Sequence, residues 1–285
     1  MTGILLVDKP EGTTSAGVIR ALKPLLRGTR VGHLGTLDPF AVGLLVVMVG
    51  RATRLAPFAA GWRKSYEGTI RLGTTTVTDD CTGDVVATSD AWRSLGRDGI
   101  AAALARFQGG YEQRPPAYSA VKVAGERAYR RARRGEAVAL ATRRVEVTEL
   151  ELADLALPDV RFRATVSGGT YLRSVARDVG EALGCGAHLA ALTRTGVGPF
   201  RLEQAVDPAV VTPRDLRDPA VLVADLPRRE LDEAELEAVI HGRAVRAGDG
   251  TRESGHVALF SSGTLVAVGL RVGDLLKPRV VVADA

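Results

Sequence analysis

Residues 32–45 read Gly32-His33-Leu34-Gly35-Thr36-Leu37-Asp38-Pro39-Phe40-Ala41-Val42-Gly43-Leu44-Leu45. The glycines of this segment can adopt backbone angles that are closed to other residues, and the proline after Asp38 biases that aspartate toward an extended conformation. The apolar run at 44–49 is short, β-rich and followed by a glycine, which predicts a buried strand. We therefore expect a loop that holds one carboxylate in a fixed place beside a core strand. The alternative is that Asp38 only caps a helix beginning at Pro39, because Asp and Pro are favoured at these two positions.

The composition is that of an ordinary globular protein with an excess of basic residues. The chain has 285 residues, 46% hydrophobic and 25% charged, with a net charge of +5 and a pI of about 9.5. Lysine accounts for five of the 38 basic residues, and the rest are arginine, whose planar guanidinium suits phosphates and base edges. This balance favours a polyanionic partner, although an arginine-rich genome would produce the same bias.

The cysteines and histidines argue against a metal centre. Two cysteines and four histidines are spread along the chain without metal-binding spacing, so we expect neither a structural metal nor a disulfide framework. The N-terminal apolar run is too short for a signal peptide, and no run approaches the ~20 apolar residues of a membrane helix. These features predict a cytoplasmic protein that does not enter a membrane.

Apolar periodicity, turn residues and caps predict the secondary structure. Strands are expected at 4–7, 44–49, 64–72, 84–88, 145–152 and 160–166. Helices are expected at 52–60 and 100–107, from a Thr/Ser cap at 13–15 to about 26, and at 171–183 after a cap at 167–170. The proline-spaced segment 208–227 indicates a boundary. Beyond it we expect a helix at 231–240 and strands at 257–260, 265–271 and 280–282.

Segment 32–45 resembles the active-site motif of the TruB family of tRNA pseudouridine synthases, in which the aspartate is catalytic. One position departs from the family pattern: Val42 stands where Thr or Ser is usual, which changes the hydrogen bonding available to the loop. Five further segments resemble other motifs of the family. They are Lys9-Pro10-Glu11-Gly12, Lys64-Ser65-Tyr66, residues 78–84, Tyr171-Leu172-Arg173-Ser174 and residues 186–196. The resemblance extends over nearly the whole chain.

The resemblance implies a set of site residues. Asp38 is expected to be catalytic, Arg173 to pair with its carboxylate, and Tyr66 to stack on the target base and to be a candidate for moving the C5 proton. The other residues expected to bind substrate are His33, which can fill the space left by the flipped base, Lys9, Tyr171, Leu192, Arg130, Arg131 and Arg134.

Each of these residues also has an ordinary structural interpretation. Tyr66 can be a half-buried strand tyrosine, Leu192 plain core, His33 a structural histidine and Lys9 a solvated turn residue. Arg173 can be a surface residue in a first helical turn, although a cation is less suited to a helix start.

Five arginines lie within eight positions at 127–134. At 3.6 residues per turn, those at 127, 130, 131 and 134 share one helix face. Such a face repels itself unless anions meet it, so it either binds RNA or is a solvated charged surface. The resemblance implies that this region, near 115–135, is a lobe that clamps RNA.

The resemblance also implies the architecture. We expect an α+β pseudouridine-synthase fold whose mixed, mostly antiparallel central sheet is flanked by helices. Residues 1–228 would form the catalytic domain, and residues 229–285 a small β-rich PUA-like domain that binds RNA. A structural cap on the main domain is the alternative for the second part.

Pseudouridine formation breaks the C1′–N1 bond of uridine and rejoins the ring through C5, so nothing is oxidised or added and no cofactor is expected. A carboxylate beside the sugar can act as a nucleophile at C1′ or as a base toward the 2′ position, and the sequence does not decide between them. We expect the substrate to be the T-loop uridine at tRNA position 55, reached by base flipping. The expected partner is the tRNA T-arm, with no metal, no membrane and no obligate protein partner, and with the chain acting as a monomer.

Three other functions fit the sequence less well. A guide-RNA-dependent synthase inside a ribonucleoprotein is disfavoured by short termini without basic tails. A non-catalytic tRNA-binding or folding module would not need the complete set of Asp38, Tyr66 and Arg173. A glycoside hydrolase would need a second carboxylate acting as an acid, and no motif supplies one.

Overall fold

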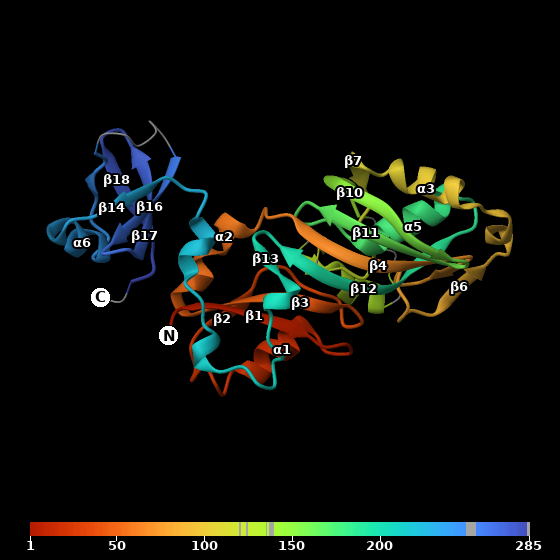
Figure 1. Ribbon diagram of the computed structural model, residues 1–285, viewed down its shortest axis with the longest axis horizontal. Helices are drawn as coiled ribbons and strands as arrows, with labels where there is room; N and C mark the ends of the chain where they lie inside the picture. The colour runs from red at the N-terminus through yellow and green to blue at the C-terminus, as the bar shows by residue number, and fades with distance from the viewer. Residues whose placement is uncertain (120, 124, 135, 137–139, 249–254, 284–285) are drawn as a thin grey trace.

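The computed structural model describes residues 1–285 except 120, 124, 135, 137–139, 249–254 and 284–285 (Figure 1). The strands of its larger part are β1 (Gly3–Lys9), β2 (Val31–His33), β3 (Val42–Val49), β4 (Lys64–Leu72), β7 (Gly109–Gln113), β10 (Arg143–Ala156), β11 (Asp159–Val166), β12 (Ala187–Val197) and β13 (Phe200–Arg201). Within the described residues they form one sheet with the main order β1-β3-β12-β4-β11-β10-β7. Only β3 and β12 pair in parallel, so the predicted mixed, mostly antiparallel sheet is confirmed.

Strand β3 is buried on both faces, which explains its unbroken apolar sequence. Leu44, Val46 and Met48 join one hydrophobic cluster, whereas Leu45, Val47 and Val49 join another that includes β1 and helix α1 (Ser15–Leu22). Because side chains alternate across a strand, one apolar run supplies both cores. The strand that follows the Asp38 loop is therefore fixed from two sides.

Two helices pack on a single hydrophobic cluster with the middle of the sheet. They are α3 (Arg97–Ala105) and α5 (Leu172–Ala182). Ile100 from α3 and Val175 from α5 are buried in the same cluster as Ile70 of β4 and Phe162 of β11. These packed helices match the helical spacing predicted at 100–107 and 171–183, and they place the first turn of α5 beside the sheet.

Two predicted helices are shorter or tighter than expected. Helix α1 is capped by the Thr14 hydroxyl, which accepts a hydrogen bond from the Gly17 amide at 2.9 Å, but it ends at Leu22 and not near residue 26. Pro24 lacks the amide donor that a longer helix needs. The helix predicted at 52–60 is a 3-10 helix, η1 (Gly50–Leu55), followed by a single α-helical turn, α2 (Ala56–Ala59).

Several small elements lie outside the larger sheet. They are β5 (Thr74–Thr76) paired with β6 (Val85–Thr88), the 3-10 helix η2 (Ala91–Ser94), the pair β8 (Lys122–Val123) and β9 (Glu126–Arg127), and helix α4 (Ala128–Arg133). The strand predicted at 84–88 corresponds to β6. The arginine-rich segment begins at the end of β9 and forms α4.

A second sheet forms the C-terminal part, at the left of Figure 1. Three 3-10 helices lead to it, η3 (Leu202–Gln204), η4 (Pro213–Asp215) and η5 (Pro219–Val223). Its strands are β14 (Arg228–Glu230), β15 (Val245–Arg246), β16 (Gly255–Ser261), β17 (Thr264–Val272) and β18 (Leu275–Val281), with helix α6 (Glu233–Ile240) packed on it. The order is β14-β16-β17-β18-β15. Because β14 begins at Arg228, the division that we predict at 228/229 falls on its first residues.

The two parts share a hydrophobic cluster. Leu55 of η1 and Leu222 of η5 are buried with Phe260 of β16 and Val268 of β17. The guanidinium of Arg51 also donates a hydrogen bond to the carbonyl of Ala283. The second sheet is therefore attached to the first through buried apolar side chains as well as through the connecting segment.

Candidate active site

The Asp38 loop joins β2 to β3 and is not the start of a helix. Residues 34–41 are irregular, and the Asp38 carbonyl accepts a single turn bond from the Ala41 amide at 3.2 Å. The interpretation of Asp38 as a helix cap is therefore wrong. Gly43 has φ of +99°, and a Cβ there would lie 2.5 Å from the Arg194 carbonyl oxygen, so only glycine allows β3 to approach β12 this closely.

The backbone on both sides of Asp38 is held by buried side chains. The hydroxyl of Ser15 accepts a hydrogen bond from the Leu37 amide at 2.9 Å and donates to the Leu37 carbonyl at 3.2 Å. On the other side, the Lys9 ammonium donates to the carbonyl of Pro39 at 3.2 Å. The loop thus presents Asp38 from a rigid frame.

Lys9 is buried, so the interpretation as a solvated turn residue is wrong. Its side chain is fully buried, and its ammonium also donates to the carbonyls of Pro10 and Thr13, at 2.9 and 2.6 Å. Burial lowers the pKa of Lys9. Lys9 does not line the pocket beside Asp38; its contacts hold the loop, and a contact with RNA stays a prediction.

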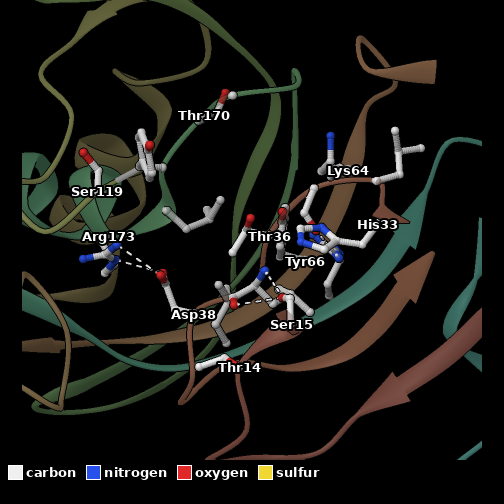
Figure 2. Close-up of a pocket in the computed structure, with 18 of the residues that line it drawn as sticks. Thr14, Ser15, His33, Thr36, Asp38, Lys64, Tyr66, Ser119, Thr170 and Arg173 are labelled. Atoms are coloured by element: carbon white, nitrogen blue, oxygen red, sulfur yellow. Dashed lines mark hydrogen bonds and ion pairs between the residues drawn. The ribbon is translucent and has the colours of Figure 1, made fainter. Parts of the chain in front are cut away.

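Asp38 and Arg173 form a two-pronged ion pair (Figure 2). Nε of Arg173 donates to one Asp38 oxygen at 2.9 Å, and Nη2 donates to the other at 3.2 Å. The arginine side chain is 5% exposed and the aspartate side chain 35% exposed. The carboxylate is therefore aimed by its partner while part of it stays open to the pocket.

Arg173 also ties three segments of the site together. Its Nη1 donates to the Thr78 carbonyl at 2.9 Å and its Nη2 to the Tyr118 carbonyl at 3.0 Å. Nη1 lies 3.5 Å from a carboxylate oxygen of Asp80, which is itself buried. Asp80 holds its own turn, through Thr78 and Thr82, and in addition faces the guanidinium.

Burial dominates the electrostatics of Asp38. Removal from water raises its pKa above the ordinary value, the Arg173 guanidinium opposes this, and the charge of Asp80 adds to it. The desolvation of the loop outweighs the effect of the guanidinium, so the net shift of the pKa is upward.

The start of α5 is held by Gln113, which the sequence did not identify. Its side-chain oxygen accepts from the Tyr171 amide at 2.8 Å, and its side-chain nitrogen donates to the Tyr171 carbonyl at 3.1 Å. The cap predicted at 167–170 is wrong, because the residue before α5 is Tyr171 and no side chain caps the helix from that position. The Ser167 hydroxyl accepts from the Glu146 amide instead. Gln113 therefore positions the turn that carries Arg173.

One pocket of about 860 Å³ opens beside the ion pair. Among the residues that we predicted for the site, it is lined by His33, Asp38, Tyr66, Tyr171, Arg173 and Leu192. Tyr66 on β4 and Leu192 on β12 are 7% and 8% exposed, and they come from adjacent strands. Arg143 stacks on the ring of Tyr171, with its guanidinium carbon 4.5 Å from the ring centroid. The pocket therefore combines one carboxylate with aromatic and aliphatic walls.

Three basic residues of the pocket were not among the predicted site residues. One is Arg143, which stacks on Tyr171. The others are Lys64, which begins β4, and Arg194 in β12, and both are buried. Lys64 and Arg194 each belong to a segment that resembles a family motif, but neither spacing nor residue type indicated that the two side chains meet.

The arginine-rich segment meets carboxylates of its own. Arg131 lies 2.8 Å from Glu136, and Arg134 lies 2.7 Å from both Glu126 and Glu136. Neither arginine lines the pocket. Arg131 and Arg134 therefore meet carboxylates of the chain itself, which is a third arrangement beside the RNA contact and the solvated surface expected from the sequence. The side chain of Arg130, the third arginine that we predicted to bind RNA, lies outside the described part of the structure.

Two further properties bear on cofactors and membranes. In the described part of the chain, no three His, Cys, Asp or Glu side chains gather as a metal-ligating group. Across the same residues, every helix is too short or too polar to cross a bilayer.

Comparison with known proteins places this site in a family. The model described as TruB family pseudouridylate synthase (N terminal domain) matches residues 23–172, and the one described as tRNA pseudouridylate synthase B C-terminal domain matches residues 173–241. A protein named tRNA pseudouridine synthase B from Arthrobacter sp. (strain FB24) is 41% identical over 100% of this chain and 98% of its own. A protein of the same name from Burkholderia mallei (strain NCTC 10247) is 42% identical, with the same coverage.

Solved structures show the same fold. A chain in a crystal structure of a Cbf5-Nop10-Gar1 complex superposes with a TM-score of 0.73 at 27% identity, covering 98% of this chain and 84% of that one. A chain of an archaeal box H/ACA sRNP Nop10-Cbf5 complex gives a TM-score of 0.72 at 25% identity, with coverage of 98% and 85%. The fold is therefore the predicted pseudouridine-synthase fold. With family models and whole-length relatives in agreement, this chain belongs to the TruB family of pseudouridylate synthases.

Proposed function

We propose that the chain converts the T-loop uridine at position 55 of tRNA to pseudouridine, with Asp38 as the catalytic residue. The observation that carries the proposal is the bidentate Asp38–Arg173 pair on a clamped loop, open on one side to a pocket with aromatic and aliphatic walls. The names of the whole-length relatives support tRNA as the substrate.

The pocket suits a base that has left its stack. Flipping a nucleotide costs a few kcal/mol, and stacking it on an aromatic ring returns on the order of 1–3 kcal/mol. Tyr66 offers a ring at the pocket wall, and Leu192 offers an apolar surface on the neighbouring strand. Tyr66 is therefore proposed to stack on the flipped uracil, and its hydroxyl to help remove the C5 proton.

Asp38 is proposed to act at the ribose. The guanidinium of Arg173 fixes both carboxylate oxygens, and the remaining lone pairs face the pocket. From there the carboxylate can attack C1′ or accept a proton from the 2′ position, and both steps need the ionised form. In the first route a C1′–O bond to Asp38 forms as the C1′–N1 bond breaks, and it breaks in turn when C5 bonds to C1′. In the second route the 2′ proton moves to Asp38 as the C1′–N1 bond breaks, and it returns to C2′ when C5 bonds to C1′. The uracil turns before the new bond forms; C5 then loses its proton and N1 gains one, so the product is an isomer of the substrate.

The remaining assignments complete the proposal. His33 lines the pocket and is proposed to fill the gap in the RNA stack. Residues 1–228 are proposed to carry the reaction, and residues 229–285 to contact RNA away from the target base. The chain is proposed to act as a monomer in the cytoplasm, where tRNA is found.

The test is incubation of the purified chain with an unmodified tRNA transcript, without guide RNA or other protein, followed by mapping of pseudouridine. We expect one modified position, uridine 55. A transcript in which uridine 55 is replaced by cytidine is the control and should remain unmodified. Modification at another position would contradict uridine 55 as the target. Activity that appears only with added guide RNA would indicate a synthase that works inside a ribonucleoprotein.

A further inference from the structure

The pocket has a second charged end that the reaction proposed above does not use. Figure 2 shows Lys64 and His33 on one side of the pocket and Arg173 on the other, with Tyr66 between them. Arg194 lines the same pocket, and in the register of β12 and β4 it lies opposite Tyr66. Positive charge is thus present at both ends, but only the Arg173 end has a carboxylate.

Arg194 is buried with part of its hydrogen-bonding capacity unused. The residue is 0% exposed; its Nε donates to the Leu44 carbonyl at 2.7 Å and its Nη2 to the Gly35 carbonyl at 3.1 Å. Its Nη1 is buried without a hydrogen-bond partner among the described residues. Leaving a buried charged donor unsatisfied is costly, so this atom indicates a missing acceptor.

Lys64 is a second buried cation of this pocket that has few hydrogen-bond partners. It is 7% exposed, and its ammonium has one long hydrogen bond, to the Trp62 carbonyl at 3.3 Å. No ion pair joins Lys64 or Arg194 to an acidic side chain of the described residues. Burial, and after it the charge of Arg194, lowers the pKa of Lys64 to about 8. The two cations therefore repel each other.

Nη1 of Arg194 and Nζ of Lys64 both lie beside the catalytic loop. Gly35 has φ of +91°, and a Cβ added there would lie 3.5 Å from Nη1 of Arg194 and 3.8 Å from Nζ of Lys64. It would also lie 2.9 Å from Cε of Lys64, too close to fit without displacement. Glycine therefore lets the loop pack directly against both cations, which lie close to each other on one side of the pocket.

We propose that Lys64 and Arg194 form a subsite for a backbone phosphate next to the flipped uridine. The inference rests on the proposed function, because it takes RNA as the substrate. The ribose of the target nucleotide carries a phosphodiester on each side, so a ribose placed at Asp38 brings a phosphate into the same pocket. One phosphodiester would accept from both free donors and relieve the repulsion between the cations. The pocket would then hold its nucleotide by the base and the backbone together.

Binding of modified T-arm hairpins tests the subsite. Each hairpin carries one uncharged methylphosphonate, either 5′ or 3′ of the target uridine, and is compared with a hairpin that has the same 2′-deoxy sugar and an ordinary phosphodiester. For the wild-type chain we expect the Kd to rise about 10- to 100-fold at one of the two positions, the usual effect of losing a charged hydrogen bond. Lys64→Met should show part of that loss on the ordinary hairpin and a smaller further loss with the methylphosphonate, because Arg194 would still contact the phosphate.

The matched control is Lys23→Met, which removes an exposed lysine that does not line the pocket. This variant should keep the full sensitivity to the methylphosphonate. Additive losses in Lys64→Met at both positions would overturn the subsite, as would a wild-type Kd that neither modification changes. Turnover of the unmodified hairpin is measured in parallel; absence of pseudouridine there would count against the proposed function and not against the phosphate contact.

The titration of Lys64 gives a second readout. The groups that face it are Arg194 on β12 and His33 on β2, with the Asp38–Arg173 pair across the pocket. Burial and the charge of Arg194 lower the pKa of His33, so Lys64 is the group that changes charge near pH 8. RNA binding by the wild-type chain should weaken from pH 7 to pH 9, and Lys64→Arg should remove most of that slope. An equal slope in both proteins would contradict the assignment.

Discussion

At the scale of single residues, two opposing effects act on the pKa of Asp38. Burial raises its pKa, whereas the bidentate contact with Arg173 lowers it, and burial prevails. The sequence could indicate Asp38 and Arg173 because each lies in a distinctive local pattern. It could not indicate whether burial or Arg173 dominates the pKa of Asp38. That depends on how far the folded chain removes the pair from water, and the two residues lie 135 positions apart in the sequence.

The pH dependence of the reaction follows from this balance. Protonated Asp38 can neither attack C1′ nor accept a proton, so kcat/KM should fall as the pH decreases through its pKa. Because the pKa is raised, the midpoint of that acid limb should lie above the ~3.9 of an ordinary aspartate. The measurement is kcat/KM against pH, with circular dichroism showing that the chain stays folded. A midpoint at or below the ordinary value would contradict the dominance of burial.

At the scale of elements, the catalytic loop is positioned by parts of the chain that its own sequence does not reveal. Strand β3 was predictable because a strand buried on both faces must be continuously apolar. The contacts of Ser15 with the loop and of Gln113 with the residue before α5 were not predictable, because both are ordinary polar residues whose partners lie 22 and 58 positions away. Helix α5 begins after Tyr171, whose amide and carbonyl are both hydrogen-bonded by the Gln113 side chain.

Ser15→Ala tests the clamp. The substitution leaves the buried amide and carbonyl of Leu37 without their partner, a loss on the order of 1–3 kcal/mol in stability. It also loosens the loop, so kcat should fall while the Kd for tRNA changes little, because Ser15 itself makes no charged contact. Ser94→Ala, at an exposed serine of η2, is the control and should change neither quantity. A wild-type kcat in Ser15→Ala would show that the loop keeps its geometry without this hydroxyl.

At the scale of the whole molecule, the two sheets are less independent than the sequence suggested. The proline-spaced segment at 208–227 indicated a boundary, and a second sheet does begin just after it. What a linear pattern could not show is that Leu55, Leu222, Phe260 and Val268 close into one cluster across that boundary. The C-terminal part therefore contributes to the core of the larger part as well as presenting its own surface.

Removing residues 228–285 should accordingly destabilise what remains. The deletion exposes apolar side chains of η1 and η5 that are now buried, and each kcal/mol lost should lower Tm by about 2–4 °C for a chain of this size. Thermal unfolding of the truncated chain, followed by circular dichroism, measures the effect. Unfolding at the wild-type Tm would mean that the shared cluster adds nothing to the larger part.

The central claim is that the ionised oxygen of Asp38 performs the chemistry. Asp38→Asn keeps the size and shape of the side chain and removes only the charge, so the pocket and the RNA contacts should persist. The most direct measurement is single-turnover formation of pseudouridine in tRNA by this variant beside the wild type, with the Kd of both. The account predicts an unchanged Kd and no product from Asp38→Asn; pseudouridine formed at the wild-type rate would contradict it.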